Sequence, residues 1–282
     1  MQNTGRICVA DPNHRLSQKR FAINSRDIFI CPDCGCIMAD VDFDHGQYES
    51  GEYYTMQHKT VQSIEEVWGF RWRYILDQIL KINGCSSLLD VGAGNGYFVA
   101  LASREFSFDA SGLEISQEEV QFAENVLNIR LIREDLTQHN LDYDVVTCLN
   151  VLEHVVDPQL FLSHLVNRVK PGGLLVITTP NPACIHRKVK GLKNWNMIAP
   201  PHHINLFTKE SLYILLMRYG LVQLDYQTLS TYVNFVRGFD TENLLLRRLF
   251  FNLLKTFDLG ADHFFIVKKP AQCERKIKFY LQ

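Results

Sequence analysis

A short glycine-rich segment, placed between a predicted strand and a predicted helix, constrains the fold of this chain most. Residues 86–92, SSLLDVG, form an apolar run bounded by turn residues, which is the pattern of a buried strand. Glycines follow at positions 92, 94 and 96, and residues 97–105 have a helical pattern. Glycines permit a tight turn and let a ligand approach the backbone closely. The segment therefore predicts a nucleotide-type site at the end of a strand.

Strands and helices are expected to alternate through the rest of the chain. The apolar residues Trp68, Trp72, Ile75 and Ile79 recur at helical spacing. Further strands are expected at 108–115, 129–133, 143–150 and 171–180, with helices at 117–125 and 159–169. Two late strands, at 221–227 and 263–269, are expected to lie antiparallel to each other. This order predicts an α/β fold with a mostly parallel sheet and helices on both faces.

Acidic residues follow three successive predicted strands and indicate the kind of ligand. The glycine spacing is G-x-G-x-G, and Asp90 opens the loop, where a carboxylate would repel a pyrophosphate. A carboxylate there suits a ligand with a cationic amino-acid end. Glu114 is placed to accept hydrogen bonds from ribose hydroxyls, and Asp135 from an adenine amino group. We therefore expect a cationic, adenosine-bearing cofactor.

Five segments together resemble the class I S-adenosylmethionine-dependent methyltransferases: LLDVGAGNGYF, GLEIS, REDL, DVVTCLNVLEHVVDP and KPGGLLVITTPN. They span roughly residues 60–270 in the order of that family. The resemblance implies a Rossmann-like sheet of seven strands with an antiparallel last strand, and S-adenosylmethionine as cofactor. It also implies the cofactor-binding residues, which are Asp90, Gly92, Gly94, Gly96, Tyr97, Glu114, Ile115, Asp135, Leu136, Asn150 and Val151.

The Glu153–His154 pair follows the strand at 143–150 and is similar to that of ubiquinone-type small-molecule O-methyltransferases. Some relatives carry a further Glu three residues earlier and hold a divalent metal with the set. Here that position is Asn150, and losing a carboxylate weakens a site for a hard cation. We therefore expect no catalytic metal. His154 either orients its loop by hydrogen bonding or takes part in the chemistry.

The segment PPHHINLFT supplies the candidate general base. It follows the strand at 171–180 and a loop, at the sheet edge where acceptor-binding groups are expected. His203 or His202 could remove a proton from the acceptor, since imidazole titrates near neutral pH. The alternative is that these side chains only pack the loop against the next helix.

The cysteines at the N-terminus predict a small metal-binding module over residues 1–55, ahead of a cofactor-binding domain at 56–282. ICPDCGC has the form of a zinc knuckle, and Cys8 stands where a second one would begin, although Asp11 replaces its second Cys. Several sugar-modifying methyltransferases carry a similar module with two C-x-x-C pairs. We expect Zn²⁺ on Cys8, Cys31, Cys34 and Cys36, with Asp11 or His14 as alternatives to Cys36. The other interpretation is a relic fold held by packing alone.

Two further segments carry expectations about partners. Tyr53 and Tyr54 either cover the cofactor or seal the module to the main domain. A helical insertion at about 238–260 is apolar almost all round, and is expected to cover the mouth of the site or to form the contact of a homodimer. Its basic residues leave contact with a membrane surface as a further alternative.

Composition limits the functions that remain. The chain of 282 residues has a formal net charge of −2, which argues against non-specific nucleic-acid binding. It has no apolar run long enough to span a membrane and no signal-peptide pattern, so we expect a cytoplasmic location. The expected function is O-methylation of a small-molecule acceptor, such as a sugar or secondary metabolite. A tRNA or protein methyltransferase and a non-catalytic cofactor-binding module are the alternatives.

Overall fold

A computed structural model describes residues 7–16, 19–41, 60–82, 86–230 and 244–271. The strands are β1 (Lys19–Ile23), β2 (Arg26–Ile30), β3 (Ile37–Ala39), β4 (Ser87–Val91), β5 (Asp109–Leu113), β6 (Tyr143–Leu149), β7 (Val169–Pro180), β8 (Asn205–Leu206), β9 (Val222–Leu229) and β10 (Asp262–Lys268). The α-helices are α2 (Val61–Ile64), α3 (Phe70–Ile82), α4 (Tyr97–Glu105), α5 (Gln117–Leu127), α6 (Pro158–Arg168), α7 (Ile185–Lys190), α8 (Lys209–Met217) and α9 (Leu244–Thr256). Three short helical segments are η2 (Glu65–Gly69), η3 (Leu152–His154) and η4 (Leu192–Asn194).

The larger sheet has the strand order β5-β4-β6-β7-β10-β9. Strands β4 to β7 pair in parallel, and β10 is antiparallel to both β7 and β9. This arrangement confirms the predicted Rossmann-like α/β fold with an antiparallel last strand. The segment at 129–133 forms only a single parallel bridge, between Leu113 and Ile132, where a seventh strand was expected.

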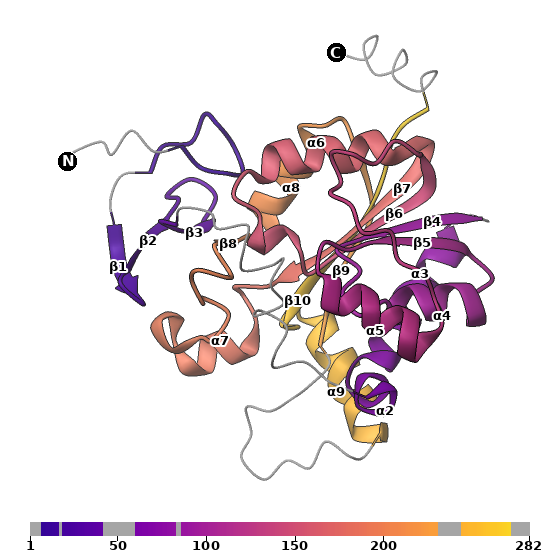
Figure 1. Cartoon of the computed structure of the whole chain (residues 1–282). Coiled ribbons are helices and arrows are strands. Elements are labelled where there is room, and N and C mark those ends of the chain that lie inside the picture. The colour runs from indigo at the N-terminus through magenta and orange to yellow at the C-terminus, as the bar shows by residue number, and fades with distance from the viewer. Residues whose placement is uncertain (1–6, 17–18, 42–59, 83–85, 231–243, 272–282) are drawn as a thin grey trace.

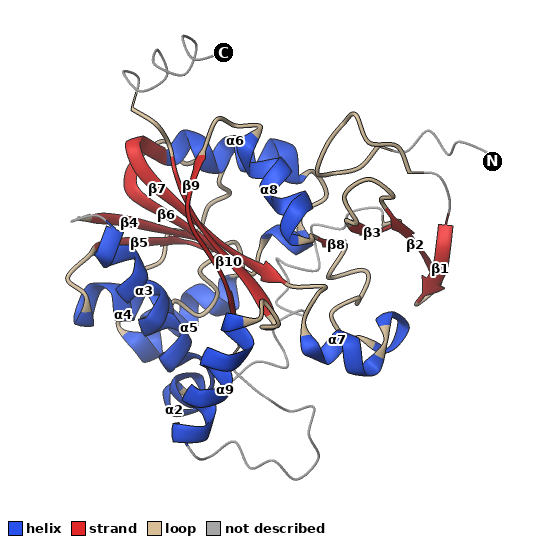
Figure 2. Cartoon of the chain, turned by 180° about the vertical axis from the view of Figure 1, so that it is seen from behind, coloured by secondary structure: helices blue, strands red, loops and turns tan. Residues whose placement is uncertain are grey.

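Helices cover both faces of the larger sheet because its central strands are apolar on both sides. Helices α6 and α8 lie on one face, and α3, α4 and α5 lie on the other (Figures 1 and 2). Within β4, Leu89 packs into the core with α6 and α8, whereas Leu88 packs into the core with α3 and α4. Neighbouring side chains of a strand therefore anchor opposite layers, as the two-residue period of a strand requires.

The smaller sheet has the order β1-β2-β3-β8 and joins two distant parts of the chain. Its last pair matches Ile37 with Leu206 and Met38 with Asn205, so the segment after His203 completes the N-terminal sheet. Strands β3 and β8 lie side by side in both views (Figures 1 and 2). Buried residues of the module, among them Cys31 and Phe29, belong to the same core cluster as residues of α6 and α8. The division at residue 55 stays a prediction.

Tyr53 and Tyr54 lie outside the described residues. Helix α9 forms within the predicted insertion, and its residues Leu249 and Leu253 are exposed, as is Phe257 directly after it. The homodimer stays a prediction. Among the described helices, none combines the length and the apolar character needed to cross a membrane.

Candidate functional site

The three glycines between β4 and α4 all have positive φ, but their surroundings differ. Gly92 has φ +73°, and a side chain there would meet Val151 at 2.5 Å. Gly96 has φ +78°, and a side chain there would meet Ile129 at 2.8 Å. Gly94 has φ +53°, and apart from Gly94 and its two chain neighbours no atom of the described residues lies within 4 Å of where its Cβ would be. Gly94 therefore faces open space that leaves room for a ligand against the backbone.

Glu114 closes this loop from the end of β5. The side chain is buried, and its Oε2 accepts a hydrogen bond from the Gly94 N–H at 2.7 Å. Its Oε1 accepts from the N–H groups of Ile115 and Ser116, both at 2.8 Å. A carboxylate offers about four lone-pair positions, so a ligand hydroxyl would share oxygens that already position the loop.

Asp90 lies at the end of β4, where it is almost fully buried. The Thr147 hydroxyl donates a hydrogen bond of 2.6 Å to its Oδ1. Burial raises the pKa of Asp90 to about 7, and the charge of Glu114 acts in the same direction. Near neutral pH this carboxyl group is therefore close to its midpoint, and a cation beside it would favour the ionised form.

The remaining cofactor predictions meet different environments. Asp135 is exposed, and its Oδ1 accepts hydrogen bonds from the backbone and hydroxyl of Thr137. Leu136 is buried in the core. The Tyr97 hydroxyl donates to Glu65, and its ring packs beside Trp72, so this side chain faces the N-terminal helical segment. Only the backbone of Tyr97 lies at the glycine loop.

Asn150 follows β6 and joins a buried polar network. It has φ +56°, a left-handed conformation that Asn tolerates better than most residues. Its Oδ1 accepts hydrogen bonds of 2.9 Å from both Arg71 and Thr178. Its Nδ2 donates to Asp262 at 3.0 Å. Asn150 is therefore oriented by the protein, while Val151 after it packs over Gly92.

Arg71 and Asp262 were not predicted from the sequence, although they hold this network together. The Arg71 Nη1 lies 2.5 Å from the Asp262 Oδ2, and the Arg71 side chain is only 2% exposed. A signal was available in the sequence, because Arg71 falls four residues before Ile75 on the buried stripe of α3. A charged residue on such a stripe implies a buried partner.

Glu153 lies in η3, directly beside this network, and is buried. Its Oε2 accepts a hydrogen bond of 3.0 Å from the Thr179 hydroxyl. Burial raises the pKa of Glu153 to about 8, and the charge of Asp262 adds to the effect. The carboxyl group is therefore largely protonated at neutral pH in the isolated chain.

His154 and His203 face each other, with ring centroids 4.7 Å apart in an edge-to-face arrangement. The His154 Nδ1 lies 3.0 Å from the His202 carbonyl, and the His203 Nδ1 lies 2.9 Å from the Met197 carbonyl. A carbonyl only accepts, so each Nδ1 carries a proton and each Nε2 carries a lone pair. Burial lowers the pKa of His154 to about 3 and that of His203 below its usual value, so both rings are neutral.

Glu153, His154 and His203 each offer one ligand atom, and these atoms lie within 4.8 Å of one another. We expected no catalytic metal because Asn150 replaces a carboxylate. One carboxylate and two imidazoles are nonetheless donor types found in catalytic zinc sites. His202 contributes its backbone carbonyl to this arrangement, through His154. The group has the chemical means to accept a proton or to hold a cation.

A second group of ligand atoms lies in the N-terminal part of the chain, with Cys8, His14, Cys31 and Cys34 within 4.8 Å of one another. The fourth member of the group is therefore His14, which was one of the two expected alternatives to Cys36, and Cys36 lies outside the group. Cys36 is fully buried beside it.

Comparisons with known proteins match this chain to methyltransferases. A family model described as a methyltransferase domain matches residues 67–225. The ubiquinone biosynthesis O-methyltransferase of Rickettsia typhi is 38% identical over 120 residues, which are 39% of this chain and 49% of that protein. The corresponding enzyme of Photorhabdus laumondii is 33% identical over 129 residues, 43% of this chain and 53% of that protein. The chain thus matches about half the length of these curated relatives.

Solved structures share the fold at low sequence identity. A SAM-dependent methyltransferase from Archaeoglobus fulgidus matches with a TM-score of 0.52 and 19% identity, over 73% of this chain and 97% of that one. Magnesium protoporphyrin IX methyltransferase from Synechocystis, solved with bound SAH, matches with a TM-score of 0.53 and 15% identity, over 79% and 97%. With more than half of its residues matched by the family model, this chain belongs to the methyltransferase domain family.

Proposed function

We propose that the chain transfers the methyl group of S-adenosylmethionine to a hydroxyl oxygen of a small molecule. The observation that carries the proposal is the glycine loop, where Glu114 holds Gly94 beside open space and Asp90 lies buried in the floor. A sulfonium group is a good leaving group, so the protein mainly has to align the acceptor with the methyl carbon.

Each of the expected cofactor-binding residues would contact a different part of S-adenosylmethionine. Asp90 would favour the cationic amino-acid end, and Glu114 would accept hydrogen bonds from the ribose hydroxyls. Asp135 would accept from the adenine amino group, and Asn150 and Val151 would border the adenine side of the pocket. Ile115 and Leu136 would complete its wall. These roles are supported by the place of Asp90 near the end of β4 and of the others at the carboxyl edge of the sheet. Glu114 and Ile115 follow β5, and Asn150 and Val151 follow β6. Asp135 and Leu136 follow the segment that bridges to β5 at Ile132.

The ionisation of Asp90 predicts a pH dependence of cofactor binding. With a pKa of about 7, Asp90 is about one-tenth ionised at about pH 6 and about nine-tenths ionised at about pH 8. A cationic ligand binds the ionised form, so its affinity should rise about tenfold across this interval. Calorimetric titration with S-adenosylmethionine at both pH values measures the change. The Asp90→Asn variant should bind more weakly and lose the pH dependence, and an equal rise in that variant would refute the assignment.

His203 is the general base that we propose. Its Nδ1–H is held by Met197, which leaves the Nε2 lone pair for the acceptor hydroxyl. His154 is a weak base because burial lowers its pKa to about 3, and it would orient His203 through the ring contact. His202 is assigned a structural role through its carbonyl.

Replacing His203 with Ala should reduce kcat about 100-fold, at the lower end for a general base, because alignment supplies most of the rate. At saturating S-adenosylmethionine, the wild-type kcat should stay level from about pH 8 down to the usual histidine pKa of about 6.5 and fall only at lower pH, since burial lowers the pKa of His203. Steady-state rates across pH give both values. His202→Ala is the matched control and should retain most of the activity. An unchanged rate and profile in His203→Ala would exclude the base role.

The acceptor is proposed to be a small molecule with an apolar body. A cavity of about 210 Å³ lies between the smaller sheet and the loop after η3. Val156 and Ile204, which follow His154 and His203 closely along the chain, line it together with Phe29 and Met38. A lining of this kind suits a ring or alkyl chain and offers few partners to a bare sugar.

Transfer of a labelled methyl group distinguishes the proposed acceptor class from the alternatives. The chain would be incubated with methyl-labelled S-adenosylmethionine and, in parallel, with small-metabolite, tRNA and protein fractions. We expect label in the metabolite fraction, because the net charge of −2 disfavours a polyanionic substrate. Label in the tRNA or protein fraction would overturn the acceptor class. Cofactor binding without transfer into any fraction would support a non-catalytic module.

The cytoplasmic location stays a prediction.

A further inference from the structure

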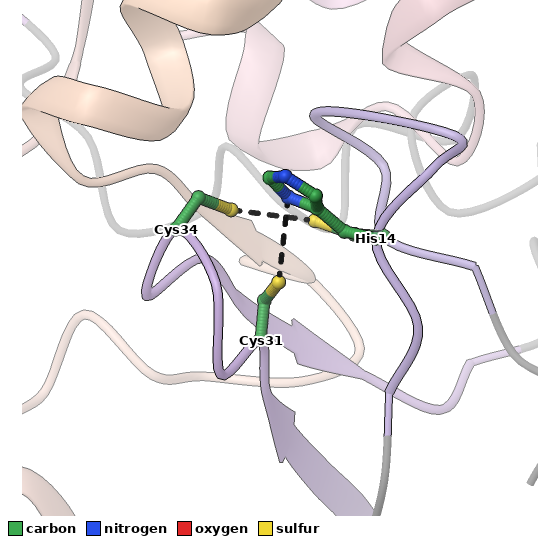
Figure 3. Close-up of side chains that lie close together, drawn as sticks. His14, Cys31 and Cys34 are labelled. Carbon is green, nitrogen blue, oxygen red and sulfur yellow. Dashed lines mark hydrogen bonds between the residues drawn. The ribbon is translucent and has the colours of Figure 1, made fainter. Parts of the chain in front are cut away.

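The N-terminal part of the chain brings four ligand-type side chains together from two loops. Cys31 and Cys34 lie at the two ends of the C-P-x-C turn after β2, and Cys8 and His14 come from the loop that precedes β1. Figure 3 shows the side chains of His14, Cys31 and Cys34 converging on one point between these loops. All three cysteines are buried and none forms a disulfide.

Two separations between the ligand atoms have the size that a tetrahedral zinc ion requires, and all of the ligand atoms lie within 4.8 Å of one another. Zn–S bonds of about 2.3 Å and Zn–N bonds of about 2.0 Å put two sulfurs about 3.8 Å apart, and a sulfur and a nitrogen about 3.5 Å apart. The Cys8 and Cys34 sulfurs are 3.6 Å apart, and the Cys31 sulfur is 3.7 Å from the His14 Nδ1. A disulfide would need about 2.05 Å.

The turn around Cys31 and Cys34 is built as a metal-binding knuckle. The Gly35 N–H donates to the Cys31 carbonyl at 2.9 Å, and the Cys31 N–H donates to the Cys36 carbonyl at 2.8 Å. Gly35 has φ +72°, which a residue with a side chain adopts only with strain. The turn thereby directs the Cys31 and Cys34 sulfurs toward the same point, and Cys36 continues into β3.

We propose that Cys8, the Nδ1 atom of His14, Cys31 and Cys34 bind one structural zinc ion. Three thiolates and one imidazole fill the tetrahedral shell, so the site is closed and has no position for a reacting water. The ion would lock the loop before β1 to the C-P-x-C turn. Cys36 is a buried core residue next to the site and is not a ligand.

The zinc site is connected to the segment that carries the proposed base. The Thr208 hydroxyl donates a hydrogen bond of 2.7 Å to the Cys34 carbonyl, and Thr208 caps α8. From β3, the Ala39 N–H donates to the Ile204 carbonyl at 2.8 Å. The Ile204 N–H in turn donates to the Glu153 carbonyl at 2.9 Å. Zinc would therefore hold His203 in place through Ile204 and Thr208, which follow it in the chain, a consequence that rests on the proposed function.

Metal analysis of the wild-type chain, expressed in zinc-supplemented medium and purified without a His tag, tests the site itself. We expect one zinc per chain. X-ray absorption at the zinc edge should give three sulfur ligands at about 2.3 Å and one nitrogen at about 2.0 Å. These measurements need neither a variant nor methyltransferase activity. A chain without zinc, or a shell of four sulfurs, would overturn the proposal.

Variants identify the fourth ligand. His14→Ala should lose most of the zinc, whereas His14→Cys should retain it because a thiolate is an equally suitable ligand. Cys36→Ala is the matched control in the same loop and should keep one zinc per chain. Loss of zinc from Cys36→Ala with retention in His14→Ala would assign the place to Cys36 and contradict the proposal. S-adenosylmethionine binding, measured in parallel, should persist in His14→Ala, which separates failure of the zinc site from failure of the proposed function.

Discussion

Replacing Arg71 with Met is expected to lower the free energy of unfolding by about 3–5 kcal/mol. The Arg71 guanidinium pairs with Asp262 and donates to Asn150, and its side chain is only 2% exposed. Removing it leaves the Asp262 carboxylate without its cation in a largely buried position, which is the situation in which a lost ion pair costs most. Denaturant unfolding followed by circular dichroism measures the change.

Arg73, two residues further along the same helix, provides the matched control. It pairs with Glu65 and Glu105, but its side chain is 33% exposed and both partners are more exposed still. Because water screens such pairs, Arg73→Met should cost at most about 1 kcal/mol. The double variant Arg71→Met with Asp262→Leu should recover part of the lost stability, since no uncompensated charge then remains. Equal and small losses in the two Met variants would contradict the role given to the buried network.

Replacing Glu114 with Gln is expected to weaken S-adenosylmethionine binding about 100-fold, or about 2.8 kcal/mol. The side chain keeps its size but loses its charge, and one of its oxygens is replaced by an NH2 group, which donates and cannot accept a hydrogen bond. Either the Gly94 N–H or the N–H groups of Ile115 and Ser116 then face another donor. The loop would lose its position, and the ribose hydroxyls would lose an acceptor.

Glu118 offers the control for this substitution. It is exposed in the first turn of α5, so Glu118→Gln changes the same charge without touching the loop. Isothermal titration calorimetry of both variants gives the dissociation constants. Unchanged affinity in Glu114→Gln would show that the carboxylate does not take part in the cofactor site.

The larger sheet could be predicted from the sequence because its information is local. Runs such as 143–149, which is short and contains the β-branched residues Val145, Val146 and Thr147, favour a buried strand over a helix, and the glycines at 92, 94 and 96 indicate a turn. The edge segment at 129–133 was expected as a strand but forms a single bridge at Ile132. A segment at the edge of a sheet has a pairing partner on one side only, and two of the five residues at 129–133 are arginines.

The acceptor side of the site could be predicted only in part, because its contacts join distant positions. Asp262 meets Arg71 across 191 residues and Asn150 across 112. The pairing of Met38 with Asn205, which brings the N-terminal module to the histidine segment, has no local signal. His14 and Cys36 were both chemically acceptable as the fourth ligand, and only the fold decides which one lies with Cys8, Cys31 and Cys34. Residue types predicted the chemistry, whereas the tertiary contacts determined the partners.

Calorimetric titration of the wild-type chain with S-adenosylmethionine, and separately with S-adenosylhomocysteine, tests the central claim most directly. Asp90, Gly94 and Glu114 are assigned to this ligand, so we predict saturable binding of one molecule of either compound per chain. Glu114→Gln should lose most of the heat at the same concentrations. Absence of binding heat with both compounds, in a chain whose circular dichroism shows it to be folded, would contradict the account.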